Sequence, residues 1–240
     1  MEITNGSSKL TVDLSGGKID NLTIHSVPLL GTFTRVDGAR ASSHLCVPNF
    51  DTEGMEQYNL PKHGPFRILM WQTIDKTDHS LTIRTTLEKT GTYPSTLECV
   101  QTFVLGEKEC THSVDVLNTG QHDAPINIAF HYYWHAPNGW ESVRINNDYV
   151  GDLVKKDTHT DLPERSVIAI PGQQPVQLTS DNCPYVQLWT GRRESHGAII
   201  YDKSYVCIEP FMLKKGSFGS PESMIAPGGT VRARITIALQ

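Results

Sequence analysis

The sequence lacks the features of a membrane or secreted protein. No apolar run approaches the roughly 20 residues that a membrane-spanning helix needs. The N-terminal segment MEITNGSSKL contains no basic stretch followed by an apolar one, so we expect no secretory signal peptide. Acidic side chains outnumber basic ones, 26 to 21, and no run of Lys and Arg is present. This balance argues against nucleic acid or an anionic membrane as a partner, and we expect a cytoplasmic protein.

The chain also lacks the motifs of the common cofactor-dependent enzymes. Its five cysteines form no Cys-x-x-Cys pair, so neither a zinc ribbon nor a redox dithiol is indicated. Buried free thiols in a reducing compartment are expected instead. No glycine-rich phosphate loop follows a predicted strand, and no serine elbow motif is present. We therefore expect neither a metal nor a cofactor.

Alternation with a period of two dominates the sequence. In the C-terminal run, the apolar residues Val231, Ala233, Ile235, Ile237 and Leu239 share one face. Such alternation is typical of strands with one buried face, and Gly, Pro and Asn turn signals separate the runs. Further strands are predicted at residues 9–14, 21–25, 80–84, 97–105, 112–117, 126–133, 142–146, 184–189, 197–201 and 205–209.

This pattern predicts an all-β fold, a sandwich with many strands. All-β sandwiches of 240 residues commonly form one domain, so we expect a single domain over residues 1–240. We find no helical stretch. The segment Ser42–Arg67 holds three prolines and little alternation, which predicts a long irregular loop. Long loops in compact domains usually carry function, and a binding site is expected on the concave face of a sheet or at strand ends.

Two histidine-bearing segments are candidates for chemistry. In Pro61–Arg67, Gly64 follows His63 and would let the backbone approach a ligand closely, while Arg67 offers a rigid fork of donors. In Asn127–His135, alternation places His131, Tyr133 and His135 on one face of a strand. Imidazoles and a phenol side by side suit a sugar, which needs stacking and hydrogen bonds together. An aromatic-rich core strand with satisfied histidines would show the same pattern.

A carboxylate interrupts the apolar strand at residues 205–209. Glu209 ends this run and is followed at once by Pro210. Breaks of this kind often mark functional or strained sites. Burial would raise the pKa of Glu209 toward the range useful for a general base. A Glu at a strand edge facing water is an equal alternative on this pattern alone.

Taken in order, the His-Gly loop, the His-aromatic-aromatic strand and the Glu-Pro strand end resemble the aldose 1-epimerase family. That family also has a Pro-Gly turn before its final strand, matched here by Ala226–Thr230. The resemblance runs from about Arg40 to the C-terminus and implies a galactose mutarotase-like supersandwich, a large antiparallel β-sandwich. The hexose-6-phosphate 1-epimerase-type branch looks nearer, because Arg40–Pro48 keeps its Arg, Cys and Pro in register, although both of its glycines are missing.

The resemblance implies roles for particular residues. His131 aligns with the family's general acid, Glu209 with its general base, and His63 with the histidine that helps to hold the ring or anomeric oxygen. The candidates for binding the substrate are Arg40, Arg67, Tyr133 and Asp152.

The implied activity is that of a mutarotase, which interconverts the α and β anomers of a hexose or hexose 6-phosphate. The expected partner is a small-molecule sugar or sugar phosphate, and the expected state a monomer or homodimer. A catalytically silent carbohydrate-binding protein on the same fold is the main alternative. The joint presence of His131 and Glu209 favours the enzyme. Glycoside hydrolysis by two carboxylates also stays open, with Asp51, Glu53, Glu56 and Glu209 as candidates.

Overall fold

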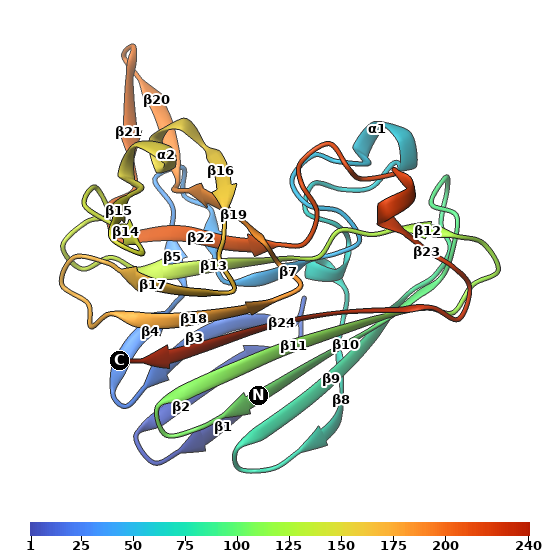
Figure 1. The fold of residues 1–240 in the computed structure, drawn as a ribbon, viewed down its shortest axis with the longest axis horizontal. Helices are drawn as coiled ribbons and strands as arrows, with labels where there is room; N and C mark the ends of the chain where they lie inside the picture. The colour runs from blue at the N-terminus through green and yellow to red at the C-terminus, as the bar shows by residue number, and fades with distance from the viewer.

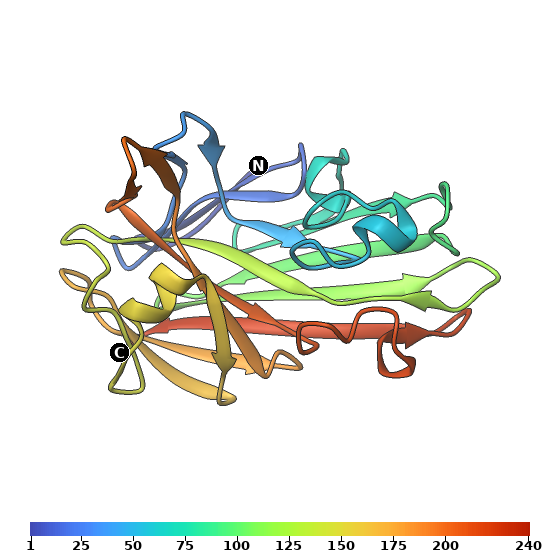
Figure 2. The same cartoon turned by 90° about the horizontal axis from the view of Figure 1, so that it is seen from above.

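The computed structural model describes residues 1–240 and consists mainly of two nine-stranded antiparallel sheets (Figures 1 and 2). The first sheet has the order β1-β2-β3-β4-β13-β22-β19-β16, and β7 also pairs with β13. Its strands are β1 (Glu2–Asn5), β2 (Ser8–Asp13), β3 (Lys18–Ile24), β4 (Val27–Leu30), β7 (His44–Cys46), β13 (Ala129–His135), β16 (Thr158–Asp161), β19 (Tyr185–Trp189) and β22 (Tyr205–Phe211).

The second sheet has the order β15-β14-β17-β18-β24-β11-β10-β9-β8. Its strands are β8 (Gln72–Lys76), β9 (Ser80–Leu87), β10 (Leu97–Leu105), β11 (Glu109–Asn118), β14 (Arg144–Ile145), β15 (Asp148–Tyr149), β17 (Arg165–Ala169), β18 (Val176–Asp181) and β24 (Thr230–Leu239). Three two-stranded ribbons complete the fold: β5 (Phe33–Thr34) with β6 (Arg40–Ala41), β12 (Ala124–Pro125) with β23 (Met224–Ile225), and β20 (Arg192–Ser195) with β21 (Ala198–Tyr201). The β20–β21 hairpin projects from the body of the molecule (Figure 1).

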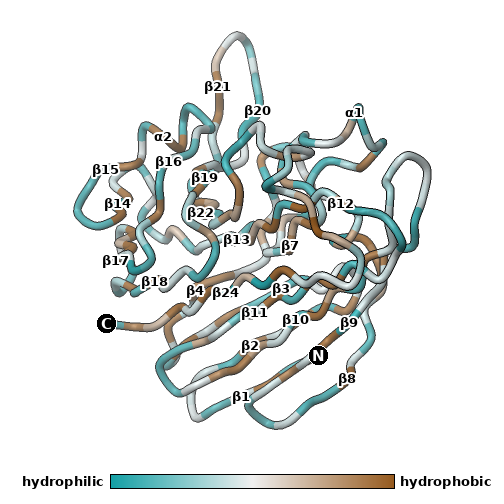
Figure 3. The backbone as a smooth tube through the Cα atoms, turned by 45° about the vertical axis from the view of Figure 1, so that its right-hand side comes forward, coloured by the Kyte–Doolittle hydropathy of each residue, from teal (hydrophilic) through white to brown (hydrophobic).

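The long strands alternate as the sequence predicts, and this alternation creates the core. In β10 and β11, buried residues are separated by more exposed ones along almost the whole length. Figure 3 shows the matching alternation of hydropathy along the tube. Most buried apolar residues of both sheets join into one cluster of 51 side chains, and two clusters of four residues lie apart from it. We propose that residues 1–240 form one domain, because the large cluster draws on both sheets.

The two central strands of the first sheet differ from the others because both of their faces are covered. Every residue of β22 is buried, and so is every residue of β13 except His135. On one face of β13, Phe130, Tyr132 and Trp134 belong to the apolar core. The other face lies under the segment from Arg35 to Arg67, which lines a hollow together with β13, β19 and β22. Functional side chains on that face are therefore shielded from bulk water.

Most predicted strands are confirmed, and β10 has the predicted bounds. The prediction that no helix occurs is wrong, since α1 (Met55–Tyr58) and α2 (Gly151–Lys156) are helical, as are the short 3₁₀ turns Phe66–Ile68 and Pro221–Ser223. These elements are too short to show a helical period in the sequence. The segment Ser42–Arg67 is likewise not wholly irregular, because it contains β7 and α1. All five cysteines are free and buried, as expected. None of the helices has the length and apolar character needed to cross a membrane.

Candidate functional site

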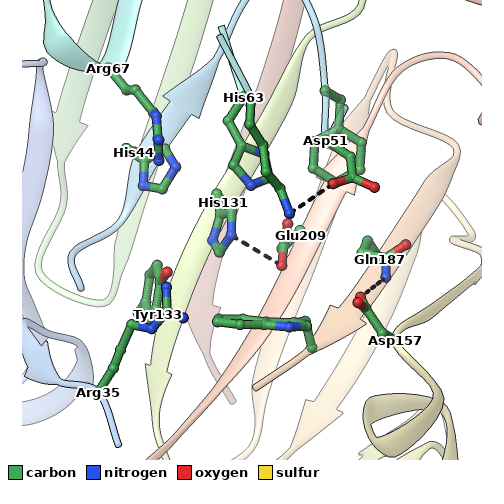
Figure 4. Close-up of a pocket in the computed structure, with 13 residues that line it drawn as sticks. Arg35, His44, Asp51, His63, Arg67, His131, Tyr133, Asp157, Gln187 and Glu209 are labelled. Atoms are coloured by element: carbon green, nitrogen blue, oxygen red, sulfur yellow. Dashed lines mark hydrogen bonds and ion pairs between the residues drawn. The ribbon is translucent and has the colours of Figure 1, made fainter. Parts of the chain in front are cut away.

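The floor of the site is built from three neighbouring strands of the first sheet. His131 and Tyr133 come from β13, Glu209 from β22, and Gln187 and Trp189 from β19 (Figure 4). The side chains alternate across each strand, so these five share the face that turns away from the apolar core. The Nε2 atom of His131 lies 3.5 Å from Oε1 of Glu209, and both side chains are almost fully buried. The pair lies on the neighbouring strands β13 and β22 although 78 positions (209 − 131) separate the two residues.

Three aromatic rings stack along this floor. His44 lies opposite His131 in the register between β7 and β13, and the two ring centroids are 4.6 Å apart with an interplanar angle of 25°. Tyr133 lies on the other side of His131, at 4.8 Å and 12°. Trp189 meets His131 edge-on at 6.0 Å. The ring of His131 is thus clamped on both faces, which fixes its orientation toward Glu209.

His63 reaches the site from the loop above the floor. Its ring meets the ring of His131 edge-on, with the centroids 5.1 Å apart. His63 and Gly64 both have positive φ, of 63° and 74°. A Cβ atom on Gly64 would collide with the carbonyl oxygen of Val47. The glycine therefore admits a close approach, but to the protein's own backbone and not to a ligand.

Charged side chains of both signs surround the hollow, whose volume is about 190 Å³. Lys62 pairs with Asp51 at 3.1 Å, and Lys215 contacts the same carboxylate at 3.0 Å. The amide of Gln187 donates a hydrogen bond of 2.8 Å to Asp157. Arg67 makes no ion pair with any carboxylate of the chain, so its guanidinium is available to a ligand.

Burial shifts the pKa values of the central pair in opposite directions. The pKa of Glu209 is raised well above its ordinary value, first by burial and then by the carboxylates of Asp157 and Asp51. The pKa of His131 is lowered well below its ordinary value, first by burial and then by the neighbouring His44 and His63. A buried environment penalises both charges, so the pair holds one proton between its two members.

A second hollow of about 200 Å³ adjoins the first and is rich in cations. Arg35, His44, Arg67 and Tyr133 line both hollows, whereas Arg40 lines only the second. Arg40 forms an ion pair of 3.0 Å with Asp20. Lys18 also lines this hollow, and Asp13 is its only acidic lining residue.

The structure brings together five of the seven predicted site residues and separates two from them. His63, Arg67, His131, Tyr133 and Glu209 line the first hollow. Arg40 lies in the neighbouring one. Asp152 lies on α2 with 85 % of its side chain exposed, pairs with Lys155 and lines neither hollow. We therefore leave Asp152 out of the site.

Sequence reasoning missed several lining residues. Gln187 and Trp189 alternate with the core residues Val186 and Leu188, so the strand period could have found them. His44 gave no such signal, because β7 has only three residues. The remaining lining residues that were missed are Arg35, Phe50, Lys62 and Asp157.

The only group of side chains that could hold a metal ion lies in the same place. Ligand atoms of His131, Cys207 and Glu209 lie within 4.8 Å of one another. Burial raises the pKa of Cys207 well above its ordinary value, so the thiol keeps its proton. A protonated thiol is a poor metal ligand, and the expectation of a metal-free protein stays a prediction.

A comparison with models of protein families matches residues 4–172 to the aldose 1-epimerase family. The chain belongs to the aldose 1-epimerase family. His63 and His131 lie within the matched segment of this family member, and Glu209 lies beyond it. A search of curated proteins finds no match.

Solved structures confirm the fold class of this aldose 1-epimerase family member as a galactose mutarotase-like β-sandwich. One is a galactose mutarotase related enzyme from Lactobacillus acidophilus, with 15 % identity, a TM-score of 0.80, and coverage of 100 % of this chain and 97 % of that chain. Another is a galactose mutarotase-like protein from Lactobacillus casei, with 15 % identity, a TM-score of 0.76, and coverage of 100 % and 99 %. At these identities the likeness shows the fold alone.

Proposed function

We propose that this protein is a mutarotase that interconverts the α and β anomers of a hexose or hexose 6-phosphate. The observation that carries the proposal is the buried pair of His131 and Glu209, 3.5 Å apart on the floor of an open hollow. Anomerisation needs one group that removes a proton from the anomeric hydroxyl and one that delivers a proton to the ring oxygen. An imidazole and a carboxylate that share one proton meet this need without another group.

Burial places the shared proton on Glu209 in the resting pair, and the reactive form arises when this proton passes to His131, which leaves Glu209 as carboxylate and His131 as imidazolium. Glu209 accepts the proton of the anomeric hydroxyl while His131 gives its proton to the ring oxygen, and the bond between C1 and the ring oxygen breaks. The pair then holds the same single proton, now on Glu209. Rotation about the C1–C2 bond presents the other face of the aldehyde, and ring closure returns both protons. Each positioned acid or base of this kind typically contributes about 10²–10⁴-fold.

The lining residues suit a sugar as the occupant. Trp189 and Tyr133 offer aromatic surface for the apolar face of a pyranose ring. His63, Gln187 and Asp157 offer polar groups around the rim for hydroxyls. Convergent polar groups with strongly shifted pKa values in one hollow are typical of an active site.

The cation-rich second hollow supports a phosphorylated hexose. Lys18 and Arg67 have no carboxylate partner in the chain, and Arg40 and Arg35 lie beside them. Guanidinium groups bind phosphate through paired charge-assisted hydrogen bonds. Because Arg67 lines both hollows, a sugar over Glu209 and a phosphate near Arg40 could belong to one molecule.

The activity is tested by adding the protein to freshly dissolved single anomers of glucose, galactose and their 6-phosphates. We expect the approach to anomeric equilibrium, followed by polarimetry or NMR exchange, to accelerate in proportion to the protein concentration. Binding of these sugars without acceleration would instead favour a silent carbohydrate-binding protein. Release of monosaccharide from a disaccharide would favour glycoside hydrolysis.

Hydrolysis by two carboxylates finds less support in the site. Burial alone would raise the pKa of Asp51, but hydrogen bonds from Lys215 and Lys62 bring it below its ordinary value. Asp51 therefore stays ionised, but both of its carboxylate oxygens are already engaged, Oδ1 with Lys62 and Oδ2 with Lys215, and neither is free to act as a base or nucleophile. Glu53 and Glu56 do not line the hollow.

Replacing Arg40 with Met tests whether the substrate carries a phosphate group. We expect the ratio of kcat/KM for a hexose 6-phosphate over the free hexose to fall by about 10–100-fold, because a hydrogen bond between charged groups is lost. The matched control is Arg234→Met, which removes an arginine paired with Asp181 in the second sheet. An unchanged ratio in the Arg40 variant would point to an unphosphorylated substrate.

A further inference from the structure

His44 occupies a position in the site that the proposed acid–base chemistry does not use. Its ring stacks on His131, its Nε2 atom is buried, and its side chain lines both hollows. In Figure 4 it lies between Arg67 and His131. His44 therefore lines the same hollow as Glu209, within reach of a sugar bound there.

The hydrogen bonds of His44 determine which of its nitrogens carries a proton. Its Nδ1 atom lies 2.9 Å from the carbonyl oxygen of Ser42. A carbonyl oxygen can only accept a hydrogen bond, so Nδ1 must be the donor. Burial, followed by the charges of Arg67 and Lys18, outweighs the raising effect of the Ser42 bond and lowers the pKa of His44 to about 3. The ring is neutral at ordinary pH, and Nε2 carries only a lone pair.

This lone pair has no partner within the protein. Nε2 of His44 is buried and no donor of the chain reaches it. A buried acceptor that stays unpaired is costly, and such groups in native structures call for an explanation. An atom that can only accept selects a donor. A sugar hydroxyl qualifies, whereas a phosphate dianion carries no hydrogen to donate.

We propose that Nε2 of His44 accepts a hydrogen bond from one hydroxyl of the bound sugar and makes the protein select for that hydroxyl. The inference rests on the proposed function and deepens it by naming a specificity-determining residue. It also divides the site by chemistry. The hydroxyl end lies at His44, and the cations Lys18, Arg40 and Arg67 define the end that takes an anion.

Two variants separate the acceptor from the rest of the ring. His44→Asn places an amide near the position of Nδ1, so it can keep the bond to Ser42 but has no acceptor at the position of Nε2. His44→Gln reaches the position of Nε2 with an acceptor oxygen but cannot keep the Ser42 bond. The matched control is His135→Asn, because His135 lies on the same face of β13 yet lines neither of the two hollows.

The experiment measures Kd and kcat/KM for glucose, galactose and the analogues of each that lack a single hydroxyl. In the unchanged protein, we expect one analogue to be poorer than its parent sugar by about 10-fold or more. In His44→Asn, the affinity and kcat/KM for the parent sugar should fall by about the same factor. The difference between the parent sugar and that analogue should shrink to about twofold or less. His44→Gln and His135→Asn should keep the penalty.

Two outcomes contradict the His44 proposal and leave the proposed function intact, and two further outcomes bear on the proposed function. If His44→Asn keeps every penalty of the unchanged protein, His44 does not read a hydroxyl. If both His44 variants lose kcat equally without any change among the analogues, the ring acts only by packing on His131. If the sugars bind but are not turned over, the Kd series still tests His44 while the mutarotase proposal fails. If no sugar binds, both proposals fail.

Discussion

Replacing Glu209 with Gln is expected to lower the rate of anomer exchange by about 10²–10⁴-fold. The amide has nearly the shape of the carboxyl group but cannot accept the proton of the anomeric hydroxyl. His131 would keep its place, because His44 and Tyr133 stack on both faces of its ring. NMR exchange or polarimetry on an accepted sugar measures the loss. Near-normal exchange by this variant would refute the assignment of Glu209 as the base.

The matched control for this variant is Glu164→Gln, which changes an exposed glutamate outside both hollows. It should exchange anomers at the rate of the unchanged protein. If both variants lost activity to the same extent, the effect would not belong to the site.

The Glu209→Gln variant should remain folded, and its stability should depend on pH differently from that of the unchanged protein. Since folding raises the pKa of Glu209, the folded protein is more stable at low pH, where this carboxyl group is protonated, than at a pH where it would be ionised. That stability is lost as the pH rises above about 4.5, the ordinary value, because the unfolded chain releases the proton and the folded one holds it. The amide does not titrate. The free energy of unfolding of the Glu209→Gln variant, relative to that of the unchanged protein, should therefore rise from acid to neutral pH. Urea titrations at several pH values would record this rise.

Replacing Gly64 with Ala is expected to destabilise the loop that carries His63. The left-handed backbone at φ 74° costs a residue with a Cβ about 1–2 kcal/mol. The collision of that Cβ with the Val47 carbonyl adds an overpacking cost of about 1–3 kcal/mol, since backbone cannot move aside as a side chain can. A total of about 3 kcal/mol corresponds to a fall in Tm of about 6–12 °C for a chain of this size. Calorimetry measures the fall, and anomer exchange should weaken because His63 shifts.

Gly228→Ala provides the control for backbone conformation. Gly228 has φ 76°, almost the same as Gly64, but a Cβ there would meet nothing within 4 Å. This variant should be destabilised only by the left-handed backbone conformation, and its Tm should fall by about 2–8 °C. Equal losses in the two variants would show that the Val47 carbonyl does not constrain the loop.

The sequence predicted most of the fold because strand alternation is a local signal. The run from Val231 to Leu239 and the run from Leu97 to Leu105 each carry enough residues to show which face is buried. The short elements escaped because they carry too few residues. β7 has three residues and α2 has six, and both depend on pairing or packing with distant segments.

Part of the site could be predicted for the same reason. Alternation alone put His131 and Tyr133 on one face of a strand and Phe130 and Tyr132 on the other, and the structure has them so. Glu209 stood out because a carboxylate in an apolar run contradicts its surroundings. Asp152 was proposed without such a local signal, and it lies on the surface of α2.

By itself, the sequence determined the all-β class and the faces of the long strands, which follow from the order of residues along single strands. The resemblance to the aldose 1-epimerase family singled out His131 and Glu209 as a candidate pair. Only the tertiary structure decided the distance between His131 and Glu209, the stacking of His44 on His131, and the division of the arginines between two hollows. Those features depend on register between strands far apart in the chain and on burial, which shifts pKa values only after both faces of β13 and β22 are covered.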